Sequence, residues 1–254
     1  MTSVVACRVA SYGEYHESAW SHLPQIGIHH VEIPAPAADE LAATQRKLQL
    51  HELTASSVQC RFDVNADDAV DVMTSQLDIC KQLSSKFAFA SVKVGDGDRD
   101  SAFATLRRIG DAAAARDVVV VMETHPDLVT NAAVATASMQ AIDHPHIRVN
   151  FDTANVSYYT EGATAVGELQ SMLPWVGAVH LKDYGGGFKQ WSFPTLGKGI
   201  VDFPKVVETL QAAGYDGPYT MELEGTKGLT FDEAGRLAYV ADSAAYLRSI
   251  GLLT

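Results

Sequence analysis

Four acidic or imidazole side chains stand at comparable places in four successive apolar segments of this chain. Glu123, Asp152, His180 and Glu222 each come at or near the end of a short run rich in Val, Ile, Phe or Met. The first two intervals between them each have the length of about one strand–helix unit, and the third contains an extended loop. If these runs are neighbouring parallel strands, the four side chains converge at one end of the sheet.

Such a cluster would be costly without compensation, because like charges raise each other's pKa and destabilise the fold. A divalent cation removes that cost, and three oxygen donors with one nitrogen donor suit a hard or borderline ion. We therefore expect one divalent metal ion here, with Mn2+ favoured and Mg2+, Co2+ or Zn2+ as alternatives. Glu224 faces the same side as Glu222 and is either an alternative ligand or a residue of the rim. We prefer Glu222 because it lies deeper in its strand.

The segments that must position these residues alternate between strand-like and helix-like patterns. Eight short apolar runs are expected to be strands, at 4–10, 27–33, 57–63, 87–94, 117–124, 146–152, 176–182 and 217–224. They show little strict alternation of apolar and polar residues, as is typical of parallel strands buried on both faces. Helical patterns are clearest at 67–83, 101–116, 203–213 and 231–249. Gly214 is placed to end the third of these helices.

This alternation of strand-like and helix-like segments predicts an α/β fold, namely a single-domain (β/α)8 TIM barrel over residues 1–254. The length of 254 residues suits one such barrel, and no stretch rich in Pro, Gly and Ser divides the chain. The first predicted strand is not followed by G-x-G-x-x-G, which argues against a dinucleotide-binding sheet.

Composition argues against several classes of function. A net charge of −12 repels phosphate backbones, so we expect no nucleic-acid partner. Three isolated cysteines without a C-x-x-C pair predict neither a disulfide framework nor a thiolate metal site, and they fit a reducing cytosol. We expect no signal peptide, no membrane span and therefore a cytoplasmic protein.

Three further polar residues lie near the expected site. His125 stands two residues after Glu123, where it supports a ligand or binds the substrate. Lys182 either polarises a substrate oxygen or forms a salt bridge with Asp183 or Glu222. Glu32, at the end of the second predicted strand, either binds a substrate hydroxyl or pairs with a neighbouring cation.

At these residues the sequence resembles the xylose isomerase-like barrel family of sugar isomerases and epimerases, over nearly its whole length. The most specific parts are FDTAN (151–155), VHLKD (179–183) followed by LGKGIVDF (196–203), and GPYTMELEG (217–225). The family includes ketose 3-epimerases, hydroxypyruvate isomerase, inosose dehydratase, dehydroshikimate dehydratase and endonuclease IV. The resemblance implies one divalent ion on Glu123, Asp152, His180 and Glu222.

Two features of the expected substrate pocket differ from the residues typical of this family. Asn155 stands where many ketose epimerases carry a substrate-binding His, and an amide can hold a hydroxyl but cannot exchange its proton. This weighs against a 3-epimerase. In the loop after the seventh strand, Phe188 and Trp191 supply aromatic rings that can cover a sugar face. The expected substrate-binding residues are thus His125, Asn155, Lys182, Trp191 and Glu32.

The activity implied is that of a metal-dependent sugar isomerase or epimerase acting on a small sugar or keto-sugar. The ion would be chelated by a carbonyl and an adjacent hydroxyl oxygen and stabilise the enediolate. Glu123 and Glu222 would be both ligands and the acid–base pair that removes and returns the proton. Barrels of this kind are often homo-oligomers, and no interface patch stands out in the sequence.

Three alternatives remain beside this expectation. A dehydratase or lyase of a keto-sugar or inosose would use the same first proton abstraction and then expel hydroxide. A nuclease like endonuclease IV is disfavoured by Asn155 and by the negative charge. A non-catalytic sugar-binding protein on the same fold is disfavoured by the intact pair of glutamates.

Overall fold

Eight parallel strands close into a barrel in the computed structural model, which describes residues 3–254. The strands are hydrogen-bonded in the order β1-β2-β3-β4-β5-β6-β7-β9, and β9 pairs with β1 to close the ring. Their bounds are β1 Val5–Arg8, β2 His30–Pro34, β3 Thr54–Gln59, β4 Phe87–Ala90, β5 Val119–Glu123, β6 Ile147–Asp152, β7 Val176–Leu181 and β9 Tyr219–Met221. The barrel predicted from the sequence is confirmed.

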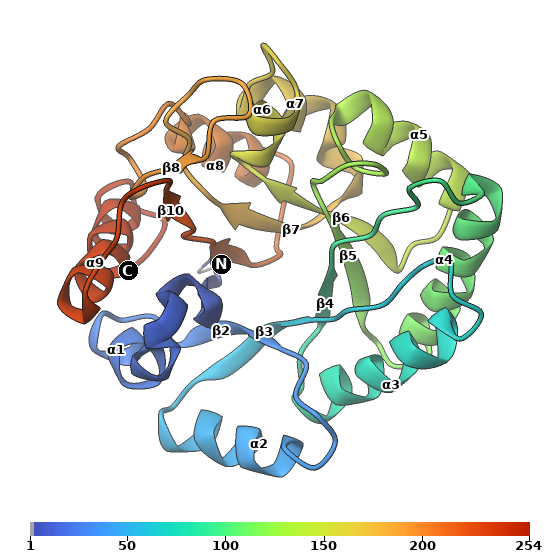
Figure 1. Ribbon diagram of the computed structural model, residues 1–254, viewed down its shortest axis with the longest axis horizontal. Coiled ribbons are helices and arrows are strands. Elements are labelled where there is room, and N and C mark those ends of the chain that lie inside the picture. Colours follow the sequence, from blue (N-terminus) through green and yellow to red (C-terminus); the bar gives the residue numbers. More distant parts are fainter. Residues whose placement is uncertain (1–2) are drawn as a thin grey trace.

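Helices form the outer layer around these strands (Figure 1). Their bounds are α1 Ala19–Gln25, α2 Leu41–Leu50, α3 Ala69–Gln82, α4 Arg99–Ala114, α5 Ala132–Ile142, α6 Asn155–Tyr159, α7 Ala165–Met172, α8 Phe203–Ala212 and α9 Glu233–Ser249, with 3-10 turns η1 at Val9–Ser18 and η2 at Leu173–Trp175. The four helices predicted from periodicity correspond to α3, α4, α8 and α9. Gly214 follows α8 with a φ of 74°, as expected of a glycine that ends a helix.

Five helices begin at a side chain that satisfies an otherwise unpaired backbone N–H of the first turn. These capping residues are Asp98, Asn131, Thr164, Asp202 and Asp232. Because capping acts between residues three apart, these helix starts are determined locally by the sequence.

The core has two layers because each strand is buried on both faces. In β5, Val120 and Met122 pack in the large layer between strands and helices. Val121, between them, points into the barrel, where it packs with Phe89 and Ala178. Apolar residues on both faces explain why the strands lack an alternating pattern.

One predicted strand is displaced. β3 runs over Thr54–Gln59, earlier in the chain than the predicted 57–63. Its first residues are polar and so did not look like a buried strand, yet they find partners inside the sheet. Ser56 Oγ donates to the Val31 carbonyl at 3.2 Å, and Ser57 Oγ donates to Glu32.

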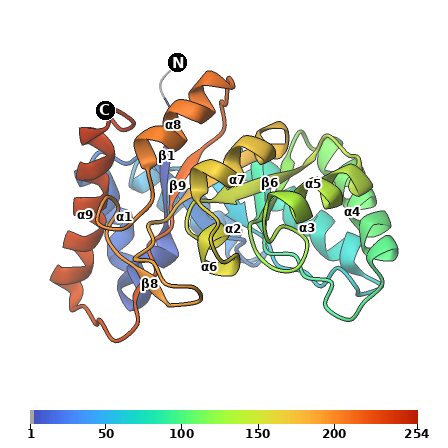
Figure 2. The ribbon, with the colours of Figure 1, turned by 90° about the horizontal axis from the view of Figure 1, so that it is seen from above.

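The two ends of the barrel differ. The C-terminus lies on one side, and the loops carrying β8 and α6 lie on the other (Figure 2). The short strand β8 (Ser192–Phe193) pairs antiparallel with β10 (Gly225–Thr226), which ties the β7–α8 loop to the β9–α9 loop. The sequence did not predict this pairing. Within residues 3–254, no helix has both the length and the apolar character needed to cross a membrane.

Candidate metal centre

Four side chains from consecutive strands converge at the C-terminal end of the barrel. Glu123 ends β5, Asp152 ends β6, His180 lies in β7 and Glu222 directly follows β9. Asp152 and His180 are register partners, and Glu222 N donates to the Leu181 carbonyl at 3.0 Å. One ligand atom from each of the four lies within 4.8 Å of the others. The sequence spacing therefore identified residues that the fold brings together.

The donor atoms of this cluster fit a divalent cation. Asp152 Oδ1 accepts hydrogen bonds from the backbone N–H groups of Ala154 and Asn155, both at 2.8 Å, while Asp152 Oδ2 is buried without a hydrogen bond. His180 Nδ1 is likewise buried without a hydrogen bond. Burial raises the pKa of Asp152, although Lys182 and His180 oppose the rise. Buried polar atoms without a hydrogen bond destabilise the folded protein unless a bound group, such as a metal ion, interacts with them.

Glu32 fixes the imidazole of His180. Glu32 Oε2 lies 3.2 Å from His180 Nε2, which leaves Nδ1 as the nitrogen available to an ion. Arg8 Nε lies 2.9 Å from the other oxygen of Glu32, and an Arg8 Nη atom pairs with Glu222. At 2% exposure, Glu32 is enclosed by these partners and does not line the cavity described below. Its position therefore suits the pairing interpretation rather than a contact with a substrate hydroxyl.

Lys182 compensates the negative charge of the cluster. Its Nζ lies 3.2 Å from Glu222 Oε2, 3.8 Å from Asp152 Oδ2 and 3.2 Å from Asn155 Oδ1, and it also pairs with Glu224. Of the two salt-bridge partners anticipated for Lys182, the structure shows Glu222.

Asp183, the other anticipated partner, holds the β7–α8 loop instead. Its carboxylate accepts hydrogen bonds from the backbone N–H groups of Tyr184, Gly197, Gly199 and Val201, at 2.7 to 3.2 Å.

A cavity of about 280 Å³ opens above the cluster. Glu123 and Glu222 line it, whereas Asp152 and His180 do not, so the two glutamates separate the buried ligands from the cavity. The expected substrate-binding residues other than Glu32 are all on its wall, namely His125, Asn155, Lys182 and Trp191.

Several wall residues were not anticipated from the sequence. They are Arg8, Gln59, Phe89, Tyr158, Tyr159 and Phe193, whereas Glu224, which also lines the cavity, was expected as an alternative ligand or a rim residue. Arg8 carried a readable signal, since it is a cation at the end of an otherwise apolar strand. The aromatic residues carried none, because they become neighbours only in three dimensions. Trp191 and Phe193 meet edge to face with ring centroids 4.9 Å apart, and Tyr158 contacts both.

A family of known proteins matches most of the chain. The sequence model described as xylose isomerase-like TIM barrel covers residues 21–250. Among solved structures, a xylose isomerase domain protein from Alicyclobacillus acidocaldarius superposes with a TM-score of 0.79 at 16% identity, over 98% of this chain and 99% of that one. A D-allulose 3-epimerase from Methylomonas sp., in complex with D-allulose, gives 0.75 at 16% identity, over 100% and 98%. At such identities these structures show the shared fold.

Curated relatives match only part of the chain. An L-ribulose-5-phosphate 3-epimerase from Salmonella paratyphi B is 32% identical over 121 residues, which are 46% of this chain and 40% of that protein. A 3-dehydroshikimate dehydratase from Bacillus anthracis is 23% identical over 122 residues, 42% and 43% of the two chains. The matched segment thus spans less than half the length of these relatives, which are a sugar epimerase and a dehydratase.

Proposed function

The chain belongs to the xylose isomerase-like TIM-barrel family, and on that premise we propose that it is a divalent-metal-dependent isomerase or epimerase of a small sugar or keto-sugar. One observation carries the proposal. Glu123 and Glu222 belong to the candidate ligand cluster and also face the cavity, so each can meet both an ion and a substrate.

The four clustered residues would hold the ion, and we favour Mn2+ because the donors are three carboxylates and one imidazole. When bound, the ion would act as a Lewis acid toward a substrate carbonyl and its neighbouring hydroxyl. Glu32 would keep His180 in the tautomer that leaves Nδ1 unprotonated.

The two glutamates would move the proton. One carboxylate takes the proton from the carbon next to the carbonyl, and the electron pair of the broken C–H bond moves toward the carbonyl oxygen. The other glutamate, protonated at the start, gives its proton to the opposite face of the same carbon in epimerisation, or to the neighbouring carbon in isomerisation. Each turnover breaks one C–H bond and forms one; in isomerisation the proton of the adjacent hydroxyl also passes to the former carbonyl oxygen, so no further reactant is needed.

The cavity wall would orient the sugar. Asn155 and Lys182, themselves joined at 3.2 Å, present an amide and an ammonium group to substrate oxygens. Trp191 presents an aromatic ring of the kind that covers an apolar sugar face.

A dehydratase is the second candidate, favoured by the similarity to 3-dehydroshikimate dehydratase. It would share the first proton transfer. The second glutamate would then protonate a departing hydroxyl group, so that water leaves and a C=C bond forms.

Solvent exchange distinguishes these reactions. Metal-loaded protein would be incubated in D2O with candidate ketoses, the metal removed by a chelator, and the sugar examined by NMR. An isomerase or epimerase incorporates deuterium at carbon without loss of water, whereas a dehydratase yields an unsaturated product. Glu123→Gln and Glu222→Gln should each lower exchange by about 100-fold or more.

Glu208→Gln, at an exposed carboxylate on α8 that pairs with Lys205, is the matched control and should keep full activity. Exchange that persisted unchanged in both cavity variants would exclude the proposed acid–base pair.

A further inference from the structure

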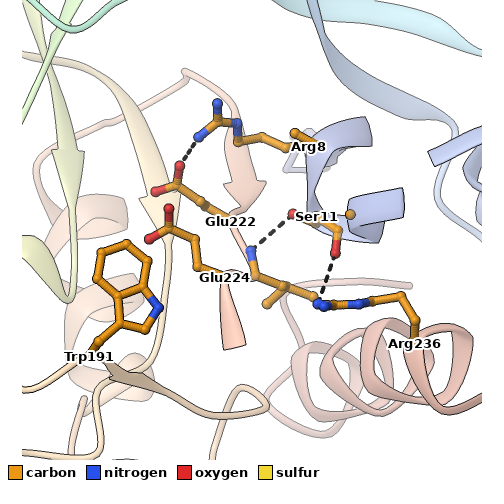
Figure 3. Close-up of a pocket in the computed structure, with 9 residues that line it drawn as sticks. Arg8, Ser11, Trp191, Glu222, Glu224 and Arg236 are labelled. Carbon is orange, nitrogen blue, oxygen red and sulfur yellow. Dashed lines mark hydrogen bonds and ion pairs between the residues drawn. The ribbon is translucent and has the colours of Figure 1, made fainter. Parts of the chain in front are cut away.

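A second cavity of about 260 Å³ adjoins the first. The two share Arg8, Trp191, Glu222 and Glu224 and are therefore lobes of one larger space. The second lobe extends away from the ligand cluster toward η1 and the start of α9. Its far wall contains Ser11 and Arg236 (Figure 3).

Of the arginine and lysine side chains that line the two lobes, all but one are paired with a carboxylate. Arg8 contacts Glu32 and Glu222, and Lys182 contacts Glu222 and Glu224. Both carboxylates of the second lobe thus already have a cation. Arg236, the third cation of these walls, has no salt bridge to any described carboxylate.

Arg236 is nevertheless held in place. One Nη atom donates to the Ser11 carbonyl at 3.3 Å, and its guanidinium lies 4.9 Å from the ring centroid of Phe231 and 5.5 Å from that of Tyr239. Its Nε is buried without a hydrogen-bond partner. A guanidinium fixed by stacking and one backbone contact loses little conformational entropy when it binds a further group.

The backbone next to Arg236 leaves room for such a group. Gly13 lines the lobe with a φ of 60°, and a Cβ placed there would lie 3.7 Å from an Nη atom of Arg236. Any side chain at this position would contact the guanidinium, so the glycine leaves this Nη atom without a neighbour there.

We propose that this lobe binds an anionic terminal group of the substrate, a carboxylate or a phosphate, through Arg236. This rests on the proposed function and narrows its substrate class to sugar acids or sugar phosphates. The planar guanidinium presents parallel N–H donors that match the oxygens of either group. A local cation is needed here because the net charge of −12 otherwise repels an anionic substrate.

Binding of unreactive analogues tests the inference without requiring turnover. Metal-loaded protein would be titrated calorimetrically with a pentitol, its 5-phosphate and the corresponding pentonate, none of which has a ketone or aldehyde group to react. One or both anionic compounds should bind at least about tenfold more tightly than the pentitol. The stronger of the two identifies the terminal group.

Arg236→Met should abolish that preference while leaving the affinity for the neutral pentitol unchanged, because Met keeps the apolar contacts with Phe231 and Tyr239. Arg236→Lys, which keeps the charge but not the planar N–H donors, should retain part of the preference for the anionic compound. Arg248→Met is the matched control, because Arg248 lies on the same helix, donates to the Ile26 carbonyl and does not line the cavity. It should bind all three compounds as the wild type does.

Equal affinity for the three compounds, or a preference that survives Arg236→Met, would overturn the inference. Failure of this inference can be distinguished from failure of the proposed function. Deuterium exchange with neutral ketoses but no anionic preference rejects only the inference. An anionic preference in a protein that exchanges no ketose and no keto-sugar phosphate rejects only the proposed reaction.

Discussion

His180 Nε2 lies 3.2 Å from Glu32 Oε2, and the other nitrogen of the same ring is buried 3.4 Å from Glu222 Oε2 without a hydrogen bond. The carboxylate of β2 thereby fixes which nitrogen of the β7 imidazole faces the ligand cluster. Carboxylates that hold a ligating histidine in this way set its tautomer and raise its basicity.

Glu32→Gln should therefore weaken divalent-metal binding by about 10- to 100-fold, since an amide neither neutralises Arg8 nor raises the basicity of His180. Calorimetric titration of metal-free protein with Mn2+ measures this. Glu224→Gln removes a carboxylate from the cavity rim and should leave metal affinity within about threefold of the wild type. Equal losses in both variants would mean that general charge, rather than the contact with His180, governs affinity.

Glu32 also makes the stability of the metal-free protein depend on pH. Burial alone would raise its pKa, but His180, Arg8 and the Ser57 hydroxyl outweigh burial and lower the pKa from 4.5 to about 2. The folded state therefore favours the ionised form, so its stabilising effect is complete above about pH 4.5 and is lost as the pH falls toward 2. At about 1.36 kcal/mol per pKa unit, the effect amounts to about 3 kcal/mol.

Urea unfolding of the wild type and of Glu32→Gln at several pH values measures this contribution of Glu32 to stability. The difference in unfolding free energy should be constant above pH 5 and shrink below pH 4. A difference independent of pH would show that the variant acts through packing alone.

Asp152→Asn should stabilise the metal-free protein at neutral pH. Burial raises the pKa of Asp152 above 3.8, so the ionised side chain disfavours the folded state above that raised pKa. An amide oxygen can still accept the hydrogen bonds from Ala154 N and Asn155 N. We expect the melting temperature of metal-free protein to rise by a few degrees and the increase on adding Mn2+ to disappear.

Glu123→Gln is the control for this variant, because Glu123 is a partly exposed member of the same cluster. It should lose the metal-induced increase without gaining stability in the metal-free state. A fall in the melting temperature of metal-free Asp152→Asn would contradict the assignment of burial as the dominant effect.

Asp183→Asn should loosen the loop that carries Trp191. The carboxylate accepts four backbone hydrogen bonds, and an amide would turn its NH2 group toward some of these donors. We expect a loss of about 2–4 kcal/mol in unfolding free energy and faster amide hydrogen exchange over residues 184–201. Asp202→Asn should change little, because Asn caps the start of α8 as well as Asp does.

Trp191→Ala should raise KM by about tenfold with a smaller effect on kcat, since the ring lines both lobes of the cavity but is not among the clustered ligands. Steady-state kinetics on the substrate identified by deuterium exchange would measure both constants. Phe188→Ala is the matched control, because Phe188 is similarly exposed in the same loop and does not line either lobe. An unchanged KM in Trp191→Ala would remove this ring from the binding surface.

The sequence by itself determined the barrel and the four clustered residues. Strands, helices and caps depend on residues close together in the chain, and each βα unit returns the C-terminal end of a strand to the same side of the sheet. Glu123, Asp152, His180 and Glu222 could therefore be aligned by counting along the chain. The start of β3 was missed because its polar side chains are satisfied by β2, which no local pattern reveals.

Tertiary structure alone decided the partners of these residues. Arg8 reaches Glu222 because β1 closes against β9, and Glu32 reaches His180 across the interior of the closed barrel. The unpaired Arg236 and the second lobe likewise arise where α9 packs beside η1. Contacts between distant segments depend on barrel closure and loop packing, and the spacing of residue types along one chain does not specify them.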